Sequence, residues 1–380
     1  MSDSVNPMGG LVQSARRLVV KVGTRVLTNQ THQLDLSRID QLVEGISRVL
    51  NSGRQVILVT SGAIGAGLGV LRWGSKPKDV AHLQAAAAVG QGRLMHVYAE
   101  RFARHGIGVA QILLTRDDMS HRQRYANARQ TMRVLLEEKI LPVVNENDTV
   151  AVDEIRFGDN DELSVHVAHL MDAQLLVILT DVDGFERRDG KGKRELVPIV
   201  KRITPELESF AGGAGQPTST GGMASKLQAA KKVTACGIPM ILANGTKPGV
   251  LTSILLENRL SGTLFLPAGK ERIAARKRWL AFTGRPAGAI LVDSGAIEAL
   301  VAKGRSLLAS GVRKVDGSFR RGDLVSVCDE KGEEFARGVV NYTQEDLSRI
   351  KGLRSEAIES LLGRKAQEVI HRDSLVILKG

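Results

Sequence analysis

Two lysines, each close to glycine, could neutralise the charge of a transferred phosphoryl group. Lys21 lies near the end of the apolar run LVVKVGT, and Lys226 ends the stretch TGGMASK at the predicted start of a helix. A lysine at the end of a buried strand needs an anion nearby, and a helix N-terminus offers free N–H groups to the same anion. Two such lysines at one sheet edge predict phosphoryl transfer, in which the protein mainly positions groups and neutralises charge. Taken alone, Lys21 is equally consistent with a surface lysine on an edge strand.

A glycine-rich turn follows the apolar run QVILV. The sequence TSGAIGAGLG, residues 60–69, holds four glycines that would let the backbone approach a ligand at the N-terminus of the next helix. The spacing matches neither the dinucleotide fingerprint nor a Walker loop, since no Gly-Lys-Ser/Thr follows. The turn therefore predicts an anion site outside the familiar nucleotide folds, with packing alone as the simpler alternative.

Carboxylate and carboxamide side chains are dense in two further stretches. These are NEND, residues 145–148, and GDND, residues 158–161, on either side of a predicted hairpin. Such groups accept hydrogen bonds from an ammonium and donate them to a carboxylate, which suits a zwitterionic substrate. Asx-rich turns are the alternative explanation, because Asn and Asp are common in turns. The repetition at two element boundaries favours the substrate site.

The elements that would position these residues alternate between short apolar strands and helices. Apolar runs begin at Leu18, Gln55, Val109, Ile140 and Leu175, and each stops at glycine or a polar residue. This alternation predicts the α/β class, with a doubly wound, mainly parallel sheet whose ligands bind beyond the carboxyl ends of the strands. The remaining predicted segments are helices at 36–50, 82–104, 122–138 and 225–235, the hairpin at 148–161 and a mobile glycine-rich loop at 210–222.

The chain divides into a large α/β part and a small β-rich part. The second part is predicted from short β-like runs that are separated by glycine turns. We expect a disordered tail at residues 1–16, the α/β domain at 17–267, a charged linker at 268–283 and the β-rich domain at 284–380.

Composition restricts the possible partners. The chain has 380 residues, 3% of them aromatic, so its core must be aliphatic, and its net charge of +12 is spread out rather than gathered in one tail. Cys236 and Cys328 stand apart without metal-ligand spacing, so we predict buried thiols and no protein metal ligands. No apolar run approaches the length of a membrane span and no signal segment is present, so we expect a cytoplasmic protein.

Seven motifs, taken in order, resemble those of the glutamate 5-kinases, a group within the amino-acid kinase family. They are KVGT, TSGAIGAG, LLTRDDM, PVVNENDTV, FGDNDELS, LTDVDG and TGGMASK. The stretches GAILVDSGAIEAL, SLLASGV, GSFRRGDLVSV and ARGVVNY are similar to a PUA domain, so the resemblance covers nearly the whole chain. It implies the amino-acid kinase fold for the larger domain and a PUA fold for the smaller one.

The resemblance implies a reaction and a set of site residues. ATP would phosphorylate the side-chain carboxylate of L-glutamate to L-glutamyl 5-phosphate, the first step of proline biosynthesis, with Mg²⁺ present and with proline as a feedback inhibitor. Lys21, Lys226 and Asp161 would be the catalytic residues, with the aspartate orienting the two lysines. The other implied contacts are Ser61, Asp148 and Asn160 for glutamate; Lys21, Thr180, Asp181, Thr220, Gly221, Gly222, Met223, Ala224, Ser225 and Lys226 for the nucleotide; and the neighbourhood of Asp118 and Glu154 for proline.

Two other functions would fit parts of the sequence. A sibling kinase that acts on acetylglutamate, aspartate, carbamate or a nucleoside monophosphate would use the same crevice, but such relatives do not usually carry a PUA domain. An RNA-binding factor would fit the PUA resemblance and the positive charge, but the terminal domain has few aromatic residues on which bases could stack. We therefore expect glutamate and proline as partners, a homo-oligomer (dimer or tetramer) and no membrane, and we keep RNA binding as an alternative that is not the expected one.

Overall fold

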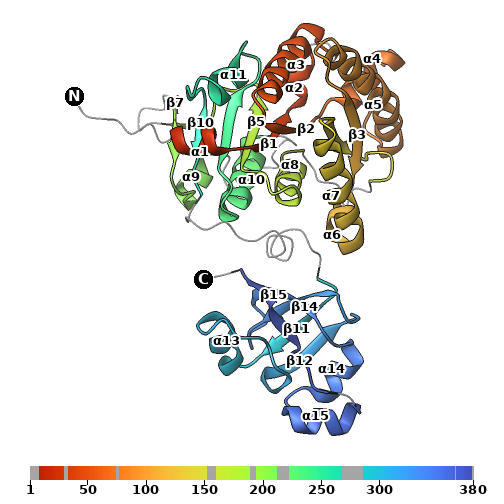
Figure 1. Ribbon diagram of the computed structural model, residues 1–380, viewed down its shortest axis with the longest axis vertical. Helices are drawn as coiled ribbons and strands as arrows, with labels where there is room; N and C mark the ends of the chain where they lie inside the picture. The colour runs from red at the N-terminus through yellow and green to blue at the C-terminus, as the bar shows by residue number, and fades with distance from the viewer. Residues whose placement is uncertain are drawn as a thin grey trace, which may run out of the picture. The chain divides into compact units, whose positions relative to one another are not determined.

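The computed structural model describes residues 8–29, 33–73, 77–151, 160–188, 194–211, 222–267, 286–363 and 365–378. Figure 1 shows the ribbon with its helices and strands labelled. The chain forms two compact units that divide near residue 272.

Unit 1 is built on an eight-stranded sheet. Its neighbouring strands are parallel except for β9 and β10, so the predicted mainly parallel sheet is confirmed. The five strands predicted from apolar runs lie together as neighbours in one part of the sheet. The strand order is β3 (Val109–Leu114), β4 (Leu141–Glu146), β2 (Gln55–Val59), β1 (Arg17–Val22), β5 (Leu175–Thr180), β9 (Met240–Asn244), β10 (Thr263–Phe265) and β8 (Ile199–Val200).

Helices cover both faces of this sheet (Figure 1). The first layer packs its apolar residues on Leu18, Val20 and Val22 of β1. Because side chains alternate along a strand, Lys21 faces the second layer instead. The first layer contains α1 (Gly9–Ser14), α3 (Leu36–Asn51), α5 (Val80–Ala103) and α11 (Val250–Leu255), and the second contains α7 (Arg122–Glu137), α8 (Asn160–Leu170) and α10 (Met223–Ala235).

The position of β1 decides between the two explanations of Lys21. The strand lies between β2 and β5, in the middle of the sheet, and the lysine is 3% exposed. Lys21 is therefore not a surface lysine on an edge strand. Its ammonium lies in the interior, where it needs a negatively charged partner.

The N-terminal segment differs from the expected disordered tail over residues 1–16. Residues 9–14 form α1, and the side chains of Met8, Val12 and Ala15 are buried in the same apolar core as β1 and α3. The physical reason is the 3–4 spacing of these apolar residues, which gives even a short helix one face to bury. Residues 1–7 lie outside the described part.

Several predicted segments fall on residues that the structure does not describe. The predicted hairpin is described only up to residue 151 and from residue 160, the glycine-rich loop only at 210–211 and 222, and the predicted linker lies wholly outside. The remaining elements of unit 1 are α2 (Thr24–Leu27), α4 (Ala63–Leu71), α6 (Arg116–Ser120), β6 (Glu186–Arg188), β7 (Arg194–Leu196) and α9 (Pro205–Phe210).

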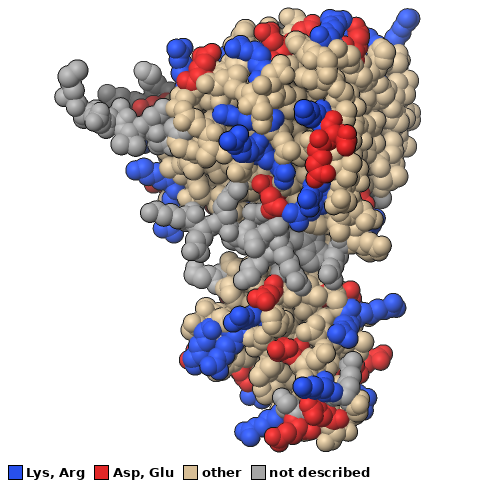
Figure 2. All heavy atoms as spheres, viewed as in Figure 1, with Lys and Arg blue, Asp and Glu red and all other residues tan. Residues whose placement is uncertain are grey.

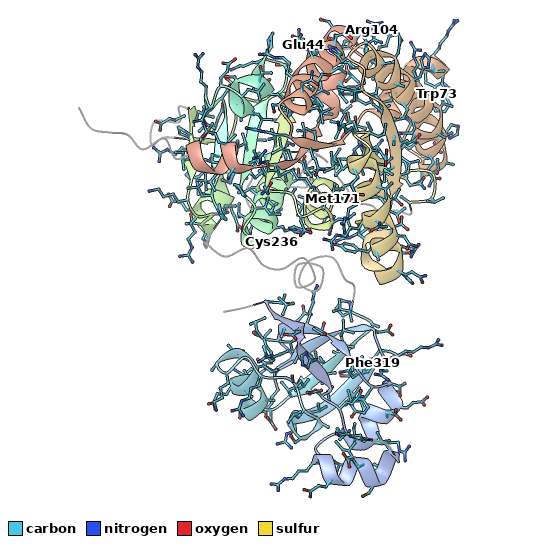
Figure 3. The ribbon with its side chains drawn as sticks, in the orientation of Figure 1. Glu44, Trp73, Arg104, Met171, Cys236 and Phe319 are labelled. Atoms are coloured by element: carbon cyan, nitrogen blue, oxygen red, sulfur yellow. The ribbon has the colours of Figure 1, made fainter. Side chains whose placement is uncertain are left out.

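Unit 2 is a small β-rich domain, as expected for the C-terminal part. A mixed five-stranded sheet surrounds a core that includes Phe319, which is labelled in Figure 3 and is 3% exposed. Positive and negative side chains both occur over the visible face of each unit (Figure 2). The sheet order is β12 (Val312–Gly317), β11 (Gly288–Val292), β13 (Leu324–Cys328), β14 (Glu334–Val340) and β15 (Ile370–Ile377), with helices α13 (Ser294–Val301), α14 (Gln344–Ile350) and α15 (Ser355–Leu362).

Two predictions from composition can be compared with the described residues. Cys236, which follows α10 and is labelled in Figure 3, is fully buried, and Cys328 is 6% exposed, so both are free and buried as expected. Burial raises the pKa of both thiols. Among the described residues, no helix is both long enough and apolar enough to cross a membrane.

Candidate active site

Three charged side chains that are far apart in the sequence meet at the carboxyl edge of the sheet. Lys21 comes from β1, Asp161 from the first turn of α8 and Lys226 from the first turns of α10. The Lys21 ammonium lies 2.5 Å from Asp161 Oδ1, and the Lys226 ammonium lies 3.1 Å from Asp161 Oδ2. All three are buried, with the aspartate 0% exposed. One carboxylate thus contacts two buried ammonium groups.

The start of α10 forms a hydrogen bond to the same aspartate. The Ser225 hydroxyl lies 3.1 Å from Asp161 Oδ2 and 2.8 Å from the carbonyl oxygen of Gly222, the residue that precedes the helix. The N-terminus of α10 therefore lies beside the two lysines, an arrangement that favours anions. Thr220 and Gly221 lie outside the described residues. Met223 and Ala224 form the first turn of α10.

A cluster of amide and hydroxyl groups lies beside the lysines. The Asn160 carboxamide donates to the Thr60 carbonyl at 2.5 Å, the Ser61 hydroxyl at 3.1 Å and Asn145 Oδ1 at 2.8 Å. Asn145 in turn donates to Gln91 Oε1 at 2.8 Å. These groups come from the ends of β2 and β4, from the start of α8 and, for Gln91, from α5. The predicted substrate residues Ser61 and Asn160 are therefore in contact.

The two clusters are joined because Asn160 and Asp161 are consecutive residues. The first side chain reaches the end of β2, and the second reaches Lys21 of β1. A ligand held by the amide cluster would therefore lie next to the ammonium groups. This arrangement suits the transfer of an anionic group between a nucleotide and a small polar acceptor.

The glycines after β2 serve two different purposes. Gly62 precedes α4 with φ +97°, a left-handed conformation that glycine adopts without strain. Gly67 packs against α5, where a Cβ would lie 1.8 Å from the Ala86 carbonyl oxygen. Gly90 of α5 does the same in return, 1.8 Å from the Ala63 carbonyl oxygen. Packing thus explains at least one of the four glycines, and only the start of α4 remains available as an anion site.

The predicted nucleotide residues Thr180 and Asp181 follow β5. The Thr180 hydroxyl donates to Asp181 Oδ1 at 3.2 Å, and Arg25 of α2 lies 3.1 Å from Asp181 Oδ2. Burial would raise the pKa of Asp181, but the bonds from Arg25 and neighbouring groups lower it, so the carboxylate is ionised. Arg25, whose side chain is 82% exposed, was not predicted from the sequence.

Three other residues were predicted to bind glutamate or proline. Asp148 is half-buried in the turn that follows β4. Asp118 accepts from both the backbone N–H and the hydroxyl of Thr115 at 2.7 Å and pairs with Arg124 at 3.1 Å, so it stabilises the start of α6. Glu154 lies outside the described residues.

A second charged cluster on α8 was missed by sequence reasoning. Glu162 lies 2.6 Å from the Lys232 ammonium and 3.9 Å from His166 Nε2. Burial would raise its pKa, but the interaction with His166 and the hydrogen bond from Lys232 lower it to about 2. Burial lowers the pKa of His166, which favours the neutral ring. The i, i+4 spacing of Glu162 and His166 was the available signal.

The described side chains of the site offer few ligands for a metal ion. Within the described ranges, no group of three or more His, Cys, Asp or Glu residues could hold a metal ion. The one carboxylate at the centre of the site, Asp161, already contacts two ammonium groups. A divalent cation here would therefore depend on phosphate oxygens and water for its ligands.

The chain is similar to known proteins in both its larger and its smaller part. The model of the amino acid kinase family matches residues 16–244, and that of the PUA domain matches residues 288–362. A glutamate 5-kinase of Moorella thermoacetica is 49% identical over 97% of both chains. That of Geobacter sulfurreducens is 48% identical over 97% of this chain and 99% of its own. A solved carbamate kinase of Giardia lamblia is 17% identical over 67% of this chain and 99% of its own, with a TM-score of 0.49.

Proposed function

We propose that this chain, which belongs to the amino acid kinase family and is a kinase of its glutamate 5-kinase group, phosphorylates L-glutamate. The γ-phosphoryl group of ATP is transferred to the side-chain carboxylate of the amino acid. The product is L-glutamyl 5-phosphate. The observation that carries the proposal is the pair of buried lysines on one aspartate, directly beside the amide cluster of Asn160 and Ser61.

The two lysines lower the main energetic barrier of this reaction. The attacking carboxylate is already ionised at neutral pH, so no general base is required. The difficulty is repulsion between the carboxylate and the phosphates. Lys21 and Lys226 reduce this repulsion, and Asp161 holds both ammonium groups in place before the substrates arrive. Mg²⁺ neutralises further charge when it is bound to the phosphates of ATP, and we assign it no protein ligand.

The amide cluster supports the assignment of glutamate to this side of the site. The Nδ2 group of Asn160 is occupied by acceptors of the protein, so its Oδ1 remains to accept a hydrogen bond from an ammonium. Ser61 contributes a hydroxyl, and Asp148 contributes a carboxylate from the turn after β4. We assign Thr180, Asp181 and the start of α10 to the nucleotide.

The finer assignments rest on the sequence resemblance. We propose a place at the first step of proline biosynthesis, a cytoplasmic location, a homo-oligomer and feedback inhibition by proline near Asp118 and Glu154. In the described residues Asp118 already has a local role at α6, so proline would act there on the conformation of this short helix.

The reaction is tested by ATP turnover in the presence of hydroxylamine, which traps an acyl phosphate as a hydroxamate. Glutamate is compared with aspartate, acetylglutamate and carbamate. We expect hydroxamate with glutamate alone. Equal or faster turnover with one of the other acceptors would reject the proposed substrate, and absence of ATP turnover with all four would reject the proposed reaction.

A further inference from the structure

Three polar residues on α5 are spaced seven positions apart and each reaches a different loop of the site. Gln84 donates to the carbonyl oxygen of Ala151 at 3.2 Å, Gln91 accepts from Asn145 at 2.8 Å, and Tyr98 shares a 2.9 Å hydrogen bond with Thr60. Seven residues are two helical turns, so the three side chains lie on one face of the helix. This face of α5 supports the loops that carry the proposed glutamate residues.

The central contact of this face has only one consistent set of donors and acceptors. Asn145 Oδ1 accepts from the backbone N–H of Glu146 at 2.9 Å, and a backbone N–H can only donate. The Nδ2 group of Asn145 must therefore face Gln91, whose Oε1 accepts from it. Oδ1 of Asn145 also accepts from Asn160. The orientation of Asn160 is thus supported by a chain of amides that ends at Gln91.

Burial makes this series of hydrogen-bonded amides sensitive to the loss of one side chain. Asn145 is 2% exposed and Gln91 is 9% exposed, so water does not readily replace either partner. Without the oxygen of Gln91, the Nδ2 group of Asn145 would be buried and unsatisfied in its observed orientation. The side chain would then be expected to turn away, and Asn160 would lose one of its three acceptors.

We infer that Gln91 is a positioning residue for glutamate binding, acting through Asn145 on Asn160, and this inference rests on the proposed function. It has no role in the nucleotide part of the site. The consequence is a separation of kinetic effects: loss of Gln91 weakens the use of glutamate while the use of ATP is retained.

The test is a double-mutant cycle that combines Gln91→Met with Asn145→Ala. We expect Gln91→Met to raise the KM for glutamate by about tenfold, a factor that corresponds to about 1.4 kcal/mol. The KM for ATP should stay within about twofold of the wild-type value, because the hydrogen bond that is lost lies outside the nucleotide site. In the Asn145→Ala background, Gln91→Met should add little further effect, because the two residues act in one chain. Gln41→Met, at an exposed position of α3, is the matched control and should leave both constants unchanged.

Three results would overturn the inference. These are an unchanged KM for glutamate in Gln91→Met, equal increases in both KM values, or effects of the two substitutions that simply multiply. The last result would mean that Gln91 acts independently of Asn145. If Gln91→Met does not fold, Gln91→Leu takes its place in the cycle. A wild-type protein without glutamate-dependent ATP turnover would instead reject the proposed function, before any variant is measured.

Discussion

Replacing Asp161 by asparagine keeps the size of the side chain and removes the charge that two buried lysines share. The two ammonium groups contact different oxygens of one carboxylate, at 2.5 and 3.1 Å, so they lie roughly 6 Å apart. At an effective dielectric constant of about 20, their repulsion amounts to about 3 kcal/mol once the carboxylate is neutral. The loss of one partner from a buried ion pair costs about 3–5 kcal/mol by direct measurement in other proteins. We therefore expect Asp161→Asn to lower the free energy of unfolding by about 3–5 kcal/mol.

The same substitution should change how ATP affects stability. In the variant, phosphates supply the negative charge that the lysines have lost, so saturating ATP should raise the melting temperature more than it does in the wild-type protein. Turnover should fall by about 10²-fold, because the two ammonium groups are no longer held in place. Urea denaturation measures the loss of free energy of unfolding, thermal denaturation with and without ATP measures the shift in melting temperature, and the hydroxamate assay measures turnover.

A matched substitution separates this prediction from a general effect of charge loss. Glu195 forms an ion pair with Arg187 at 3.0 Å, and both side chains are more than half exposed. Glu195→Gln should therefore cost less than about 1 kcal/mol. The reasoning about the buried lysines fails if Asp161→Asn is as stable as Glu195→Gln, or if it turns over within about threefold of the wild-type protein.

Three further predictions concern single side chains of the site. Lys226→Ala should lower turnover by about 10²–10³-fold, and near-wild-type turnover would remove this residue from catalysis. Asp148→Ala should chiefly raise the KM for glutamate, and a rise confined to the KM for ATP would contradict its assignment to the glutamate side. Glu162, whose folded-state pKa of about 2 lies below the ordinary 4.5, stabilises the fold above pH 4.5, and this contribution is lost as pH falls toward 2. Glu162→Gln should accordingly cost about 1–3 kcal/mol at pH 7 and almost nothing near pH 2 by urea denaturation, whereas a cost that does not change with pH would reject the charged interaction.

The central strands could be predicted from sequence because their signal is local. Runs such as LVVKV and LLVILT are apolar on both faces, and this pattern is typical of strands buried between two helical layers. Lys21 is the last but one residue of the first run and Thr180 is the last residue of the second, which placed both residues at the edge where ligands bind. Met8 and Val12 were missed because their apolar face is short and lies in an otherwise polar segment.

The contacts of the site could not be predicted in the same way, because they join residues that are far apart in the chain. Lys21 and Asp161 are separated by 140 positions, and only the packing of α8 on β1 brings them together. The resemblance to a known group named these residues and implied that Asp161 orients the two lysines, but it gave neither the distances nor the contact of Asp161 with Ser225. Gln91 had a sequence signal in its spacing from Gln84 and Tyr98, but the spacing alone does not identify a partner.

One of the glycines that first suggested an anion site, Gly67, makes a helix contact that lies next to Gln91. Gly67 and Gly90 allow α4 and α5 to approach so closely that a Cβ at either position would lie 1.8 Å from a carbonyl oxygen of the other helix. Gln91 follows Gly90 directly, so it lies next to this close approach of the two helices. A larger residue at position 90 would force α4 and α5 apart. We expect this separation to displace Gln91 from Asn145 as well, so that Asn160 would lose the hydrogen bonds that support its orientation. Packing and substrate binding are in this way two consequences of one helix contact.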